Sequence, residues 1–497
     1  MKKSKHISMI ACLAIAIAMV GCAQKQAKTK ITDIPVTTQS NDARTSVQQG
    51  LEMQDQGDQQ QARMLFTKAI EQDPKLAIAY VLRAGISNTT QEFAEDMKKA
   101  KENLSGVSNW EKWYYDYLET FLTSDWNKRL EITKTIADSF PDAARAQVDL
   151  GATYAGGNDI QNSRACYQKA VELDSNWVGG YAALTGSYLF FEPRDFKTAE
   201  GYALRTVSLA PKSPGAEIAL GDCYRAENDL AKARDAYSKA VELDPNASEG
   251  YFKKGHANTF LGNYDEARQN YSDAGTHDVS KTTSNEYIAL TYLYQGDFKT
   301  GNDKLMEFEM KADSSGESPA VIKNAKLTYL GDCERIAMQT GDAAALKSLI
   351  PMTEPMVTET GNDIGTEQAK LTQQATNLYW QSVLAAMEEN YGDAKTRAEQ
   401  IKSTLESVND PNKLDPYHFV MGYISMKQKD YGDAVSHFEQ DHPENNVYYQ
   451  YWLAMANESA GNADKANALY KQVAIYNFNG IDYALIRNEV LKKTPAM

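Results

Sequence analysis

Apolar and small residues recur along this chain at the spacing of helices. From about residue 43 to the end, they follow one another at intervals of three and four positions, and clusters of Gly, Asn, Asp and Pro interrupt them. This spacing places apolar side chains on one face of a helix, and the interruptions are typical of tight turns. The pattern predicts an all-α chain of many short helices.

A short phrase is repeated within this pattern. It consists of Gly or Asn, then Asp or Asn, an often aromatic residue, two polar residues and a small residue, as at Asn228, Gly262 and Gly296. The small residues at positions 163, 199, 233, 267 and 301 are separated by 36, 34, 34 and 34 residues. A fixed period of this length predicts stacked copies of one structural unit.

The residue types of each copy suit a pair of antiparallel helices. Small residues such as Gly221 and Ala233 allow two helix backbones to cross closely, and Tyr237 fills the space beside them. Gly and Asn tolerate the left-handed conformation of a tight turn. Pro245 ends the second helix because proline lacks the amide hydrogen. One such hairpin cannot bury its apolar face alone, so neighbouring hairpins must stack.

These positions resemble the tetratricopeptide repeat at nearly every consensus residue. The clearest copy comprises Leu220, Gly221, Tyr224, Ala233, Tyr237, Ala240 and Pro245. The resemblance implies a right-handed superhelical solenoid of about ten or eleven helix hairpins. It also implies a concave face, lined by the first helix of each hairpin, that binds extended peptides or helices.

The chain divides into five segments on this interpretation. Segments with a clear period alternate with one in which the period loosens, where Thr358 to Asp363 is expected to form a loop. The predicted segments are a signal peptide at 1–21, a flexible tether at 22–42, an N-terminal repeat array at 43–311, degenerate helical repeats with loops at 312–416, and C-terminal units with a capping helix at 417–497.

The first residues predict export and lipidation. Three lysines precede an apolar stretch at 7–20, which is too short to span a bilayer comfortably. The stretch ends in Met19-Val20-Gly21-Cys22, which resembles a bacterial lipobox and implies that Cys22 is acylated. An ordinary signal peptide with a chance cysteine is the alternative. Ala23, in place of Asp, favours the outer membrane, and we expect a protein of the cell envelope facing the periplasm.

Charge and cysteine content narrow the functional classes. The chain carries a formal charge of −15, and removal of residues 1–21 leaves 476 residues and about −18. An acidic surface repels phosphate backbones, so we expect no nucleic-acid partner. Cys166, Cys223 and Cys333 are widely spaced and form no CxxC pair, which argues against a zinc or redox site.

Sequence motifs give no indication of catalysis. No common hydrolase, metalloprotease, P-loop or dinucleotide signature occurs, and we expect neither an enzyme nor a cofactor. A site hidden between residues 313 and 415 is the alternative. His437 and Asp441 share a helix face, but they are better explained as solvated neighbours of the packing residue Phe438, so no metal is predicted.

Position within the repeat identifies candidate groove residues. By position they are expected to face the concave side, and the candidates are Arg145, Asp222, Arg225, Phe252, His256 and Thr259. Some members of the family hold a C-terminal carboxylate with a Lys and Asn clamp, but Asp222 and His256 stand where such an Asn is expected. Phe190 and Phe260 are further aromatic candidates for the groove.

Two functions remain open from the sequence. The first is a lipid-anchored scaffold or assembly factor that binds an unidentified envelope protein or peptide. The alternative is a glycan-binding outer-membrane lipoprotein, since some glycan-binding lipoproteins use helices of this repeat type.

Overall fold

The computed structural model describes residues 33–277, 281–443 and 446–495. Within them lie twenty-five α-helices and no β-strand, so the all-α prediction is confirmed. None of these helices is both long enough and apolar enough to cross a bilayer. The predicted signal peptide and Cys22 lie outside the described residues.

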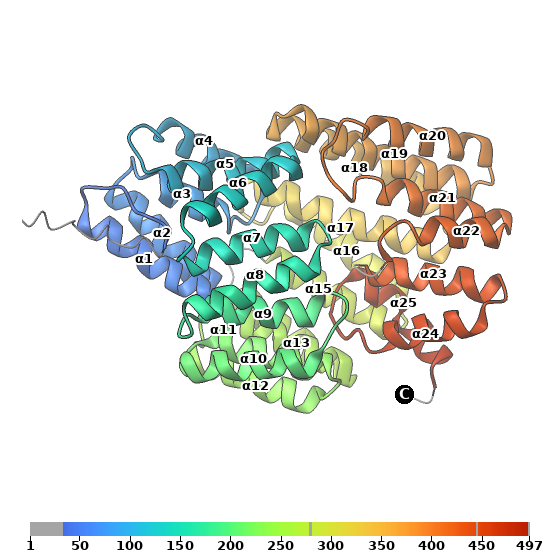
Figure 1. Ribbon diagram of the computed structural model, residues 1–497. Helices are drawn as coiled ribbons and strands as arrows, with labels where there is room; N and C mark the ends of the chain where they lie inside the picture. The colour runs from blue at the N-terminus through green and yellow to red at the C-terminus, as the bar shows by residue number, and fades with distance from the viewer. Residues whose placement is uncertain (1–32, 278–280, 444–445, 496–497) are drawn as a thin grey trace, which may run out of the picture.

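The first sixteen helices form eight antiparallel hairpins (Figure 1). The pairs are α1 (Asn41–Asp55) with α2 (Gln59–Gln72), α3 (Ala77–Ala84) with α4 (Thr90–Glu102), α5 (Asn109–Thr123) with α6 (Trp126–Ser139), α7 (Ala144–Gly156) with α8 (Ile160–Leu173), α9 (Val178–Phe190) with α10 (Phe196–Leu209), α11 (Pro214–Ala226) with α12 (Leu230–Leu243), α13 (Ser248–Leu261) with α14 (Tyr264–His277), and α15 (Thr282–Tyr294) with α16 (Phe298–Ala312).

Four further hairpins and a final helix complete the chain. They are α17 (Pro319–Thr340) with α18 (Ala343–Ile364), α19 (Glu367–Met387) with α20 (Tyr391–Thr404), α21 (Asp415–Gln428) with α22 (Tyr431–Phe438), and α23 (Val447–Ser459) with α24 (Ala463–Ala474), followed by α25 (Ile481–Lys493). The described residues therefore hold twelve hairpins, one or two more than predicted. The sequence period is lost where α17, α18 and α19 lengthen to 22, 22 and 21 residues, which made the units there hard to count.

A close contact between glycine and an aromatic ring recurs where the two helices of a hairpin cross. The ring stands sixteen positions after the glycine, and a Cβ atom added to the glycine would lie within 2.6 Å of it. The pairs are Gly50 with Phe66, Gly151 with Tyr167, Gly221 with Tyr237, Gly255 with Tyr271, and Gly422 with Phe438. This is the crossing that the sequence predicted, and it fixes the hairpin geometry because no larger residue fits.

The turn phrase also has the predicted structure. Asn228 adopts a left-handed φ of 64°, and the next residue, Asp229, caps α12 by accepting a hydrogen bond from the amide of Lys232. Gly57 and Asp58 do the same at α2, with a φ of 85° at the glycine. The turn reverses the chain and the carboxylate satisfies a free amide at the start of the second helix.

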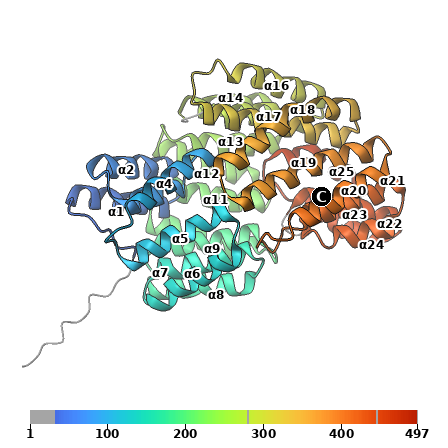
Figure 2. The same cartoon turned by 90° about the horizontal axis from the view of Figure 1, so that it is seen from above.

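The array curves until distant parts of it touch (Figures 1 and 2). Helix α4 contacts α18, α5 contacts α19, and α25 contacts α15 and α17 as well as α23 and α24. The amide of Trp126 donates to the carbonyl of Asn409 at 2.8 Å, and the Ser213 hydroxyl donates to the carbonyl of Gln56 at 3.1 Å. The superhelix therefore encloses much of its own concave side.

Three predictions about individual segments are wrong. The part of the tether that the structure describes is packed on the array, because Ile34 is buried and Asp33 pairs with Arg145. Residues 358–363 belong to α18 and not to a loop. The final helix does not cover the end of the array as a polar cap, because Tyr483 and Ile486 are buried and the helix packs between central and C-terminal hairpins.

Candidate partner-binding surfaces

All six residues predicted to line the groove are buried, and each is at most 8% exposed. Arg145 lies on α7, Asp222 and Arg225 lie on α11, and Phe252, His256 and Thr259 lie on α13. Five of them contact another hairpin or an end of the chain, which is consistent with the predicted inner position, whereas Thr259 bonds only to Gly255 and Tyr271 of its own hairpin.

Arg145 secures the N-terminal end of the folded chain. Its guanidinium donates to Asp33 at 2.6 Å and to Asp55 at 2.9 and 2.7 Å. Trp177 donates to the same Asp55 carboxylate at 2.7 Å. Burial alone would lower the pKa of Arg145, but Asp55 and Asp33 more than offset it and raise the pKa well above its usual value. Both carboxylates are therefore already engaged within the chain.

Asp222 is the centre of a buried charged group. It accepts hydrogen bonds from Arg225 at 2.8 Å and Tyr237 at 2.6 Å. Lys253 of α13 donates to its other oxygen at 3.0 Å. Burial raises the pKa of Asp222, but the positive charges of Lys253 and Arg225 lower it by more than burial raises it. The pKa therefore lies below the usual value, and the carboxylate is charged.

His256 belongs to a neutral polar group. Its Nδ1 atom lies 3.0 Å from the Tyr271 hydroxyl, and the Asn479 side chain donates to that hydroxyl at 2.8 Å. Burial, together with the nearby charges of Arg225 and Lys253, holds the pKa of His256 well below its usual value. Neutral His256 therefore contacts the C-terminal end of the chain.

The inner face of α9 to α15 is occupied by residues 475–488, which we call the C-terminal clasp. Asn477 donates to the Asn228 side chain at 2.9 Å, and the Phe478 ring lies 4.9 Å from the Arg225 guanidinium. Gly480 accepts a hydrogen bond from the Tyr294 hydroxyl at 3.4 Å. Residues of the clasp therefore contact the inner helices α11 and α15 directly.

The two further aromatic candidates also meet the clasp. The Phe190 ring lies 5.0 Å from Phe478, and the Phe260 ring lies 5.9 Å from Tyr483. Their predicted position on the inner face is consistent with these contacts. Both rings therefore contact the clasp of the same chain.

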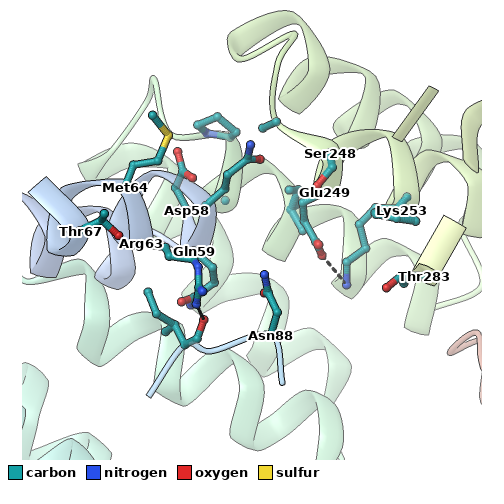
Figure 3. Close-up of a pocket in the computed structure, with 18 of the residues that line it drawn as sticks. Asp58, Gln59, Arg63, Met64, Thr67, Asn88, Ser248, Glu249, Lys253 and Thr283 are labelled. Atoms are coloured by element: carbon teal, nitrogen blue, oxygen red, sulfur yellow. Dashed lines mark hydrogen bonds and ion pairs between the residues drawn. The ribbon is translucent and has the colours of Figure 1, made fainter. Parts of the chain in front are cut away.

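An open cleft lies beside the filled groove, and we call it the α2–α13 cleft (Figure 3). It has a volume of about 770 Å³ and lies between α2, the α3–α4 turn, α11, α13 and the start of α15. Asp58 and Met64 stand on one side, and Glu249 and Lys253 on the other (Figure 3). The cleft is the open edge of the predicted groove, because Phe252 and His256 also line it.

The cleft combines apolar and oppositely charged side chains. Met64 is 60% exposed at its rim, whereas Phe252 is buried against α14 and α15. Its charged residues are Arg63, Lys68 and Lys253 together with Asp58, Glu71 and Glu249. Such a surface suits a polypeptide, which offers backbone amides, apolar side chains and both charges.

A second cavity of about 420 Å³ lies on the inner side of the C-terminal half. It is formed by α17, α19 and α23, the loop between α20 and α21, and the start of α25. The aromatic residues Tyr379, Trp380 and Tyr449 line it together with Arg335 and Asp482. Position within the repeat did not single out these residues, because the period is irregular in this half.

The histidine cluster forms no recognisable site. His418 and His437 lie 3.1 Å apart through their Nδ1 atoms, and His442 pairs with Asp415 at 2.8 Å. Burial, and then the neighbouring His437, lower the pKa of His418 to about 4. Within the described residues no three His, Cys, Asp or Glu side chains are grouped to hold a metal ion.

The three cysteines of the folded region are free thiols. Cys223 and Cys333 are buried, and burial raises the pKa of both. A buried thiol with a raised pKa is a poor nucleophile, and both side chains pack within hydrophobic clusters of the hairpins.

Family profiles match the chain over individual repeats. The profile described as "TPR repeat" matches residues 221–259, and the one described as "Tetratricopeptide repeat" matches residues 144–176 and 248–274. These segments coincide with α7–α8 and with α11 to α14. These segments are therefore tetratricopeptide repeats, and the other helix hairpins of the array have the same two-helix plan.

Curated relatives share short stretches with it. The chain is 32% identical over 90 residues to the heat shock protein sti1 homolog of Schizosaccharomyces pombe, which is 18% of this chain and 15% of that protein. It is 23% identical over 269 residues to superkiller complex protein 3 of Mus musculus, which is 45% of this chain and 17% of that protein. The chain thus spans about a sixth of the length of these relatives.

A solved structure with a similar fold is that of yeast Tom70. The two sequences are 15% identical, the match covers 85% of this chain and 90% of the Tom70 chain, and the TM-score is 0.44.

Proposed function

We propose that this protein is a lipid-anchored scaffold or assembly factor of the bacterial cell envelope, and that it binds a protein partner at the α2–α13 cleft. The cleft carries the proposal because it is the part of the predicted groove that the C-terminal clasp leaves open. Its volume of about 770 Å³ accommodates several residues of an extended peptide. The proposal includes no catalytic step.

The anchor is proposed from the sequence. The lipobox at Met19-Val20-Gly21-Cys22 would place acyl chains on Cys22, and Ala23 favours retention in the outer membrane. The folded array begins soon afterwards, since Asp33 already packs against Arg145. We therefore propose that the scaffold faces the periplasm and stands close to the membrane surface.

The identity of the partner is not carried over from the relatives. One of them is named Hsp70-Hsp90 organizing protein 2, of Arabidopsis thaliana, and this chain covers 16% of it. Asp222 stands where a carboxylate clamp of that type requires an amide, and the charge of Asp222 is already engaged by Arg225 and Lys253. The α2–α13 cleft, with both signs of charge, fits an internal peptide segment better than a free C-terminal carboxylate.

Crosslinking in intact envelopes tests the proposal. Met64→Asp introduces a charge at the rim of the cleft, and Met310→Asp is a matched control on α16, where Met310 is 68% exposed and lies outside the cleft. Cys22→Ala removes the anchor. We expect the same envelope protein to be enriched by wild type and Met310→Asp, and to be lost with Met64→Asp and reduced with Cys22→Ala.

Each alternative result overturns a separate part of the proposal. Equal enrichment with Met64→Asp would show that the partner binds elsewhere on the chain. No enriched protein under several crosslinking conditions would remove the scaffold function. Absence of radiolabelled palmitate from the wild-type protein would remove the lipid anchor.

A further inference from the structure

The cavity in the C-terminal half is lined by several separate elements. It has a volume of about 420 Å³, and both the loop at residues 405–413 and Ser124, which follows α5, line it. The contact between α5 and α19 holds the N-terminal half of the array beside this cavity. A volume of this size holds a small molecule of one or two rings.

Aromatic residues form a fixed wall of this pocket. Tyr449 is stacked on Phe419 with ring centroids 4.6 Å apart and an interplanar angle of 22°. Tyr379 contacts Phe419 from α19, with centroids 6.1 Å apart, and its neighbour Trp380 lies edge-on to it at 5.0 Å. Because Phe419 is fully buried, these contacts hold the rings of the wall in place.

Arg335 presents hydrogen-bond donors to the pocket. Its side chain is 45% exposed although it projects into the inner side of the array. The nearest carboxylate oxygens, on Asp332 and Asp482, lie 3.6 and 3.7 Å from its guanidinium, which is beyond ordinary hydrogen-bond length. The guanidinium is thus held by two charges while its donors remain accessible.

The charges on the pocket wall balance. Arg335 and Lys413 are matched by Asp410 and Asp482. A strongly charged ligand would meet a like charge here, whereas a neutral ligand that both donates and accepts hydrogen bonds would satisfy both kinds of wall residue. The aromatic wall further requires that the ligand have an apolar ring face.

We propose that this pocket binds a neutral saccharide of one or two rings. The hydroxyl groups of a sugar serve both as donors and as acceptors, and its ring carries C–H groups that pack on Tyr379, Trp380 and Tyr449. Arg335 and Asp482 also line the pocket, where they can form hydrogen bonds with the hydroxyl groups. This site is separate from the α2–α13 cleft, with which it shares no residue.

Titration of neutral sugars into the full-length protein tests the inference. The protein is kept in a detergent without a sugar headgroup, and a panel of neutral hexoses, N-acetylhexosamines and disaccharides is examined by isothermal titration calorimetry and saturation-transfer NMR. We expect at least one sugar to bind with a dissociation constant between about 10 µM and 1 mM, as is typical of ligands of this size.

Two variants and a control assign the binding to the pocket. Trp380→Ala is expected to weaken it at least about tenfold, and Trp380→Phe, which keeps a ring, to weaken it less. Tyr431→Ala is the control, because Tyr431 begins α22 at the far end of α21 from the pocket residue Pro416. Thermal unfolding followed by circular dichroism confirms that each variant is folded.

Several results would contradict binding of a saccharide in this pocket. No binding by any sugar at millimolar concentration overturns the inference, as does binding that Trp380→Ala leaves unchanged. Free amino acids and tripeptides are titrated in parallel, and tighter binding of these would replace the saccharide with a peptide. Trp380→Ala should still enrich the crosslinked partner, so failure here is distinguishable from failure of the scaffold function.

Discussion

The two halves of the array differ in what covers their inner faces. In the N-terminal half, the clasp fills the curve, and polar residues such as Asp222 and His256 are satisfied by partners within the chain. In the C-terminal half, the corresponding surface of α17, α19 and α23 retains a cavity, and the donors of Arg335 are only loosely held. The two faces are built from the same kind of hairpin, so the repeat alone does not decide which face can bind a ligand.

Whether a concave face can bind a ligand therefore depends on what already covers it as much as on the residues that form it. Polar side chains on the inner helices are needed in both cases. Where a segment of the same chain meets them, they contribute to stability, and where none does, they are available for recognition. The predictions below test this distinction, beginning with the largest expected effect.

Removal of the clasp aromatic Tyr483 should open the N-terminal half selectively. Tyr483 is 1% exposed, packs against Phe260 and Tyr294, and donates to the carbonyl of Ala474 at 3.0 Å. Tyr483→Ala leaves a large cavity and is expected to lower the free energy of unfolding by about 3–5 kcal/mol in urea titration.

Hydrogen exchange then distinguishes the halves. Amide exchange in Tyr483→Ala should accelerate in α11, α13 and α15 and remain nearly unchanged in α19 and α20, because the main helix contacts of α25 are with α15, α17, α23 and α24. Uniform acceleration throughout the chain would show that the two halves are not separable in this way.

The pH dependence should have opposite sign at two buried carboxyl groups, Glu334 and Asp222. Burial raises the pKa of Glu334 on α17 to about 7, so the folded state binds a proton there that the unfolded state releases. The contribution of Glu334 to the free energy of unfolding should therefore fall as pH rises from about 4.5 to 7, by at most about 3 kcal/mol, and Glu334→Gln should remove this contribution.

Asp222 gives the reverse behaviour. Its lowered pKa means that its contribution to stability is present above the unfolded value near pH 3.8 and is lost as pH falls below it. Asp222→Asn should lower stability at neutral pH and flatten the acid limb of the curve. Denaturant midpoints measured between pH 3 and pH 8 test both variants, and a change of the same sign in both would contradict the assignment.

Equivalent glycines in the two halves should respond unequally. A Cβ at Gly221 would lie 2.4 Å from the Tyr237 ring, and one at Gly422 would lie 2.6 Å from the Phe438 ring. Tyr237 cannot move without losing its hydrogen bond to Asp222, whereas Phe438 has no hydroxyl. We expect a loss of about 1–3 kcal/mol for each Gly→Ala change, with the larger loss at Gly221.

A third glycine provides the control for this comparison. Gly331 lies within α17 and has no atom near the place of an added Cβ. Gly331→Ala should raise stability by about 0.5–1 kcal/mol in the same denaturant assay, because alanine favours a helix interior. Equal losses at Gly221 and Gly422 would show that the hydrogen bond of Tyr237 does not restrict its ring.

The smallest effect is expected from a single clasp amide. Asn477→Ala removes the 2.9 Å hydrogen bond to Asn228 and should lower the free energy of unfolding by about 1 kcal/mol. Measurement of the urea midpoint tests this value. A loss well above that of Tyr483→Ala would mean that polar contacts, and not the aromatic packing, hold the clasp.

The hairpins could be predicted because their determinants are local. Gly221, Tyr237 and Pro245 specify a helix crossing and its end within a few dozen residues, and the turn at Asn228-Asp229 follows from the backbone preferences of those two residues. The same local pattern predicts helices over Trp110 to Leu122 and Trp126 to Ser139, and α5 and α6 begin and end within one residue of these bounds.

The occupant of the inner face could not be predicted in the same way. The clasp sequence Asn477-Phe478-Asn479-Gly480 shows no helical period and is typical of a turn. Its hydrogen-bond partners on other hairpins lie 186 to 252 positions earlier, on helices that no local signal connects to it. The burial of Arg225 and His256 beneath the clasp depends on this long-range closure.

Closure by the clasp also sets the order in which the molecule can be completed. Asn479 and Tyr271 are 208 positions apart, and contacts of such separation form late because they must close a long loop of chain. The early hairpins can stack as they appear, but their interior stays open until the last helix of the chain is synthesised and reaches them. A truncation near the end of the gene would therefore damage the half of the protein that is encoded first.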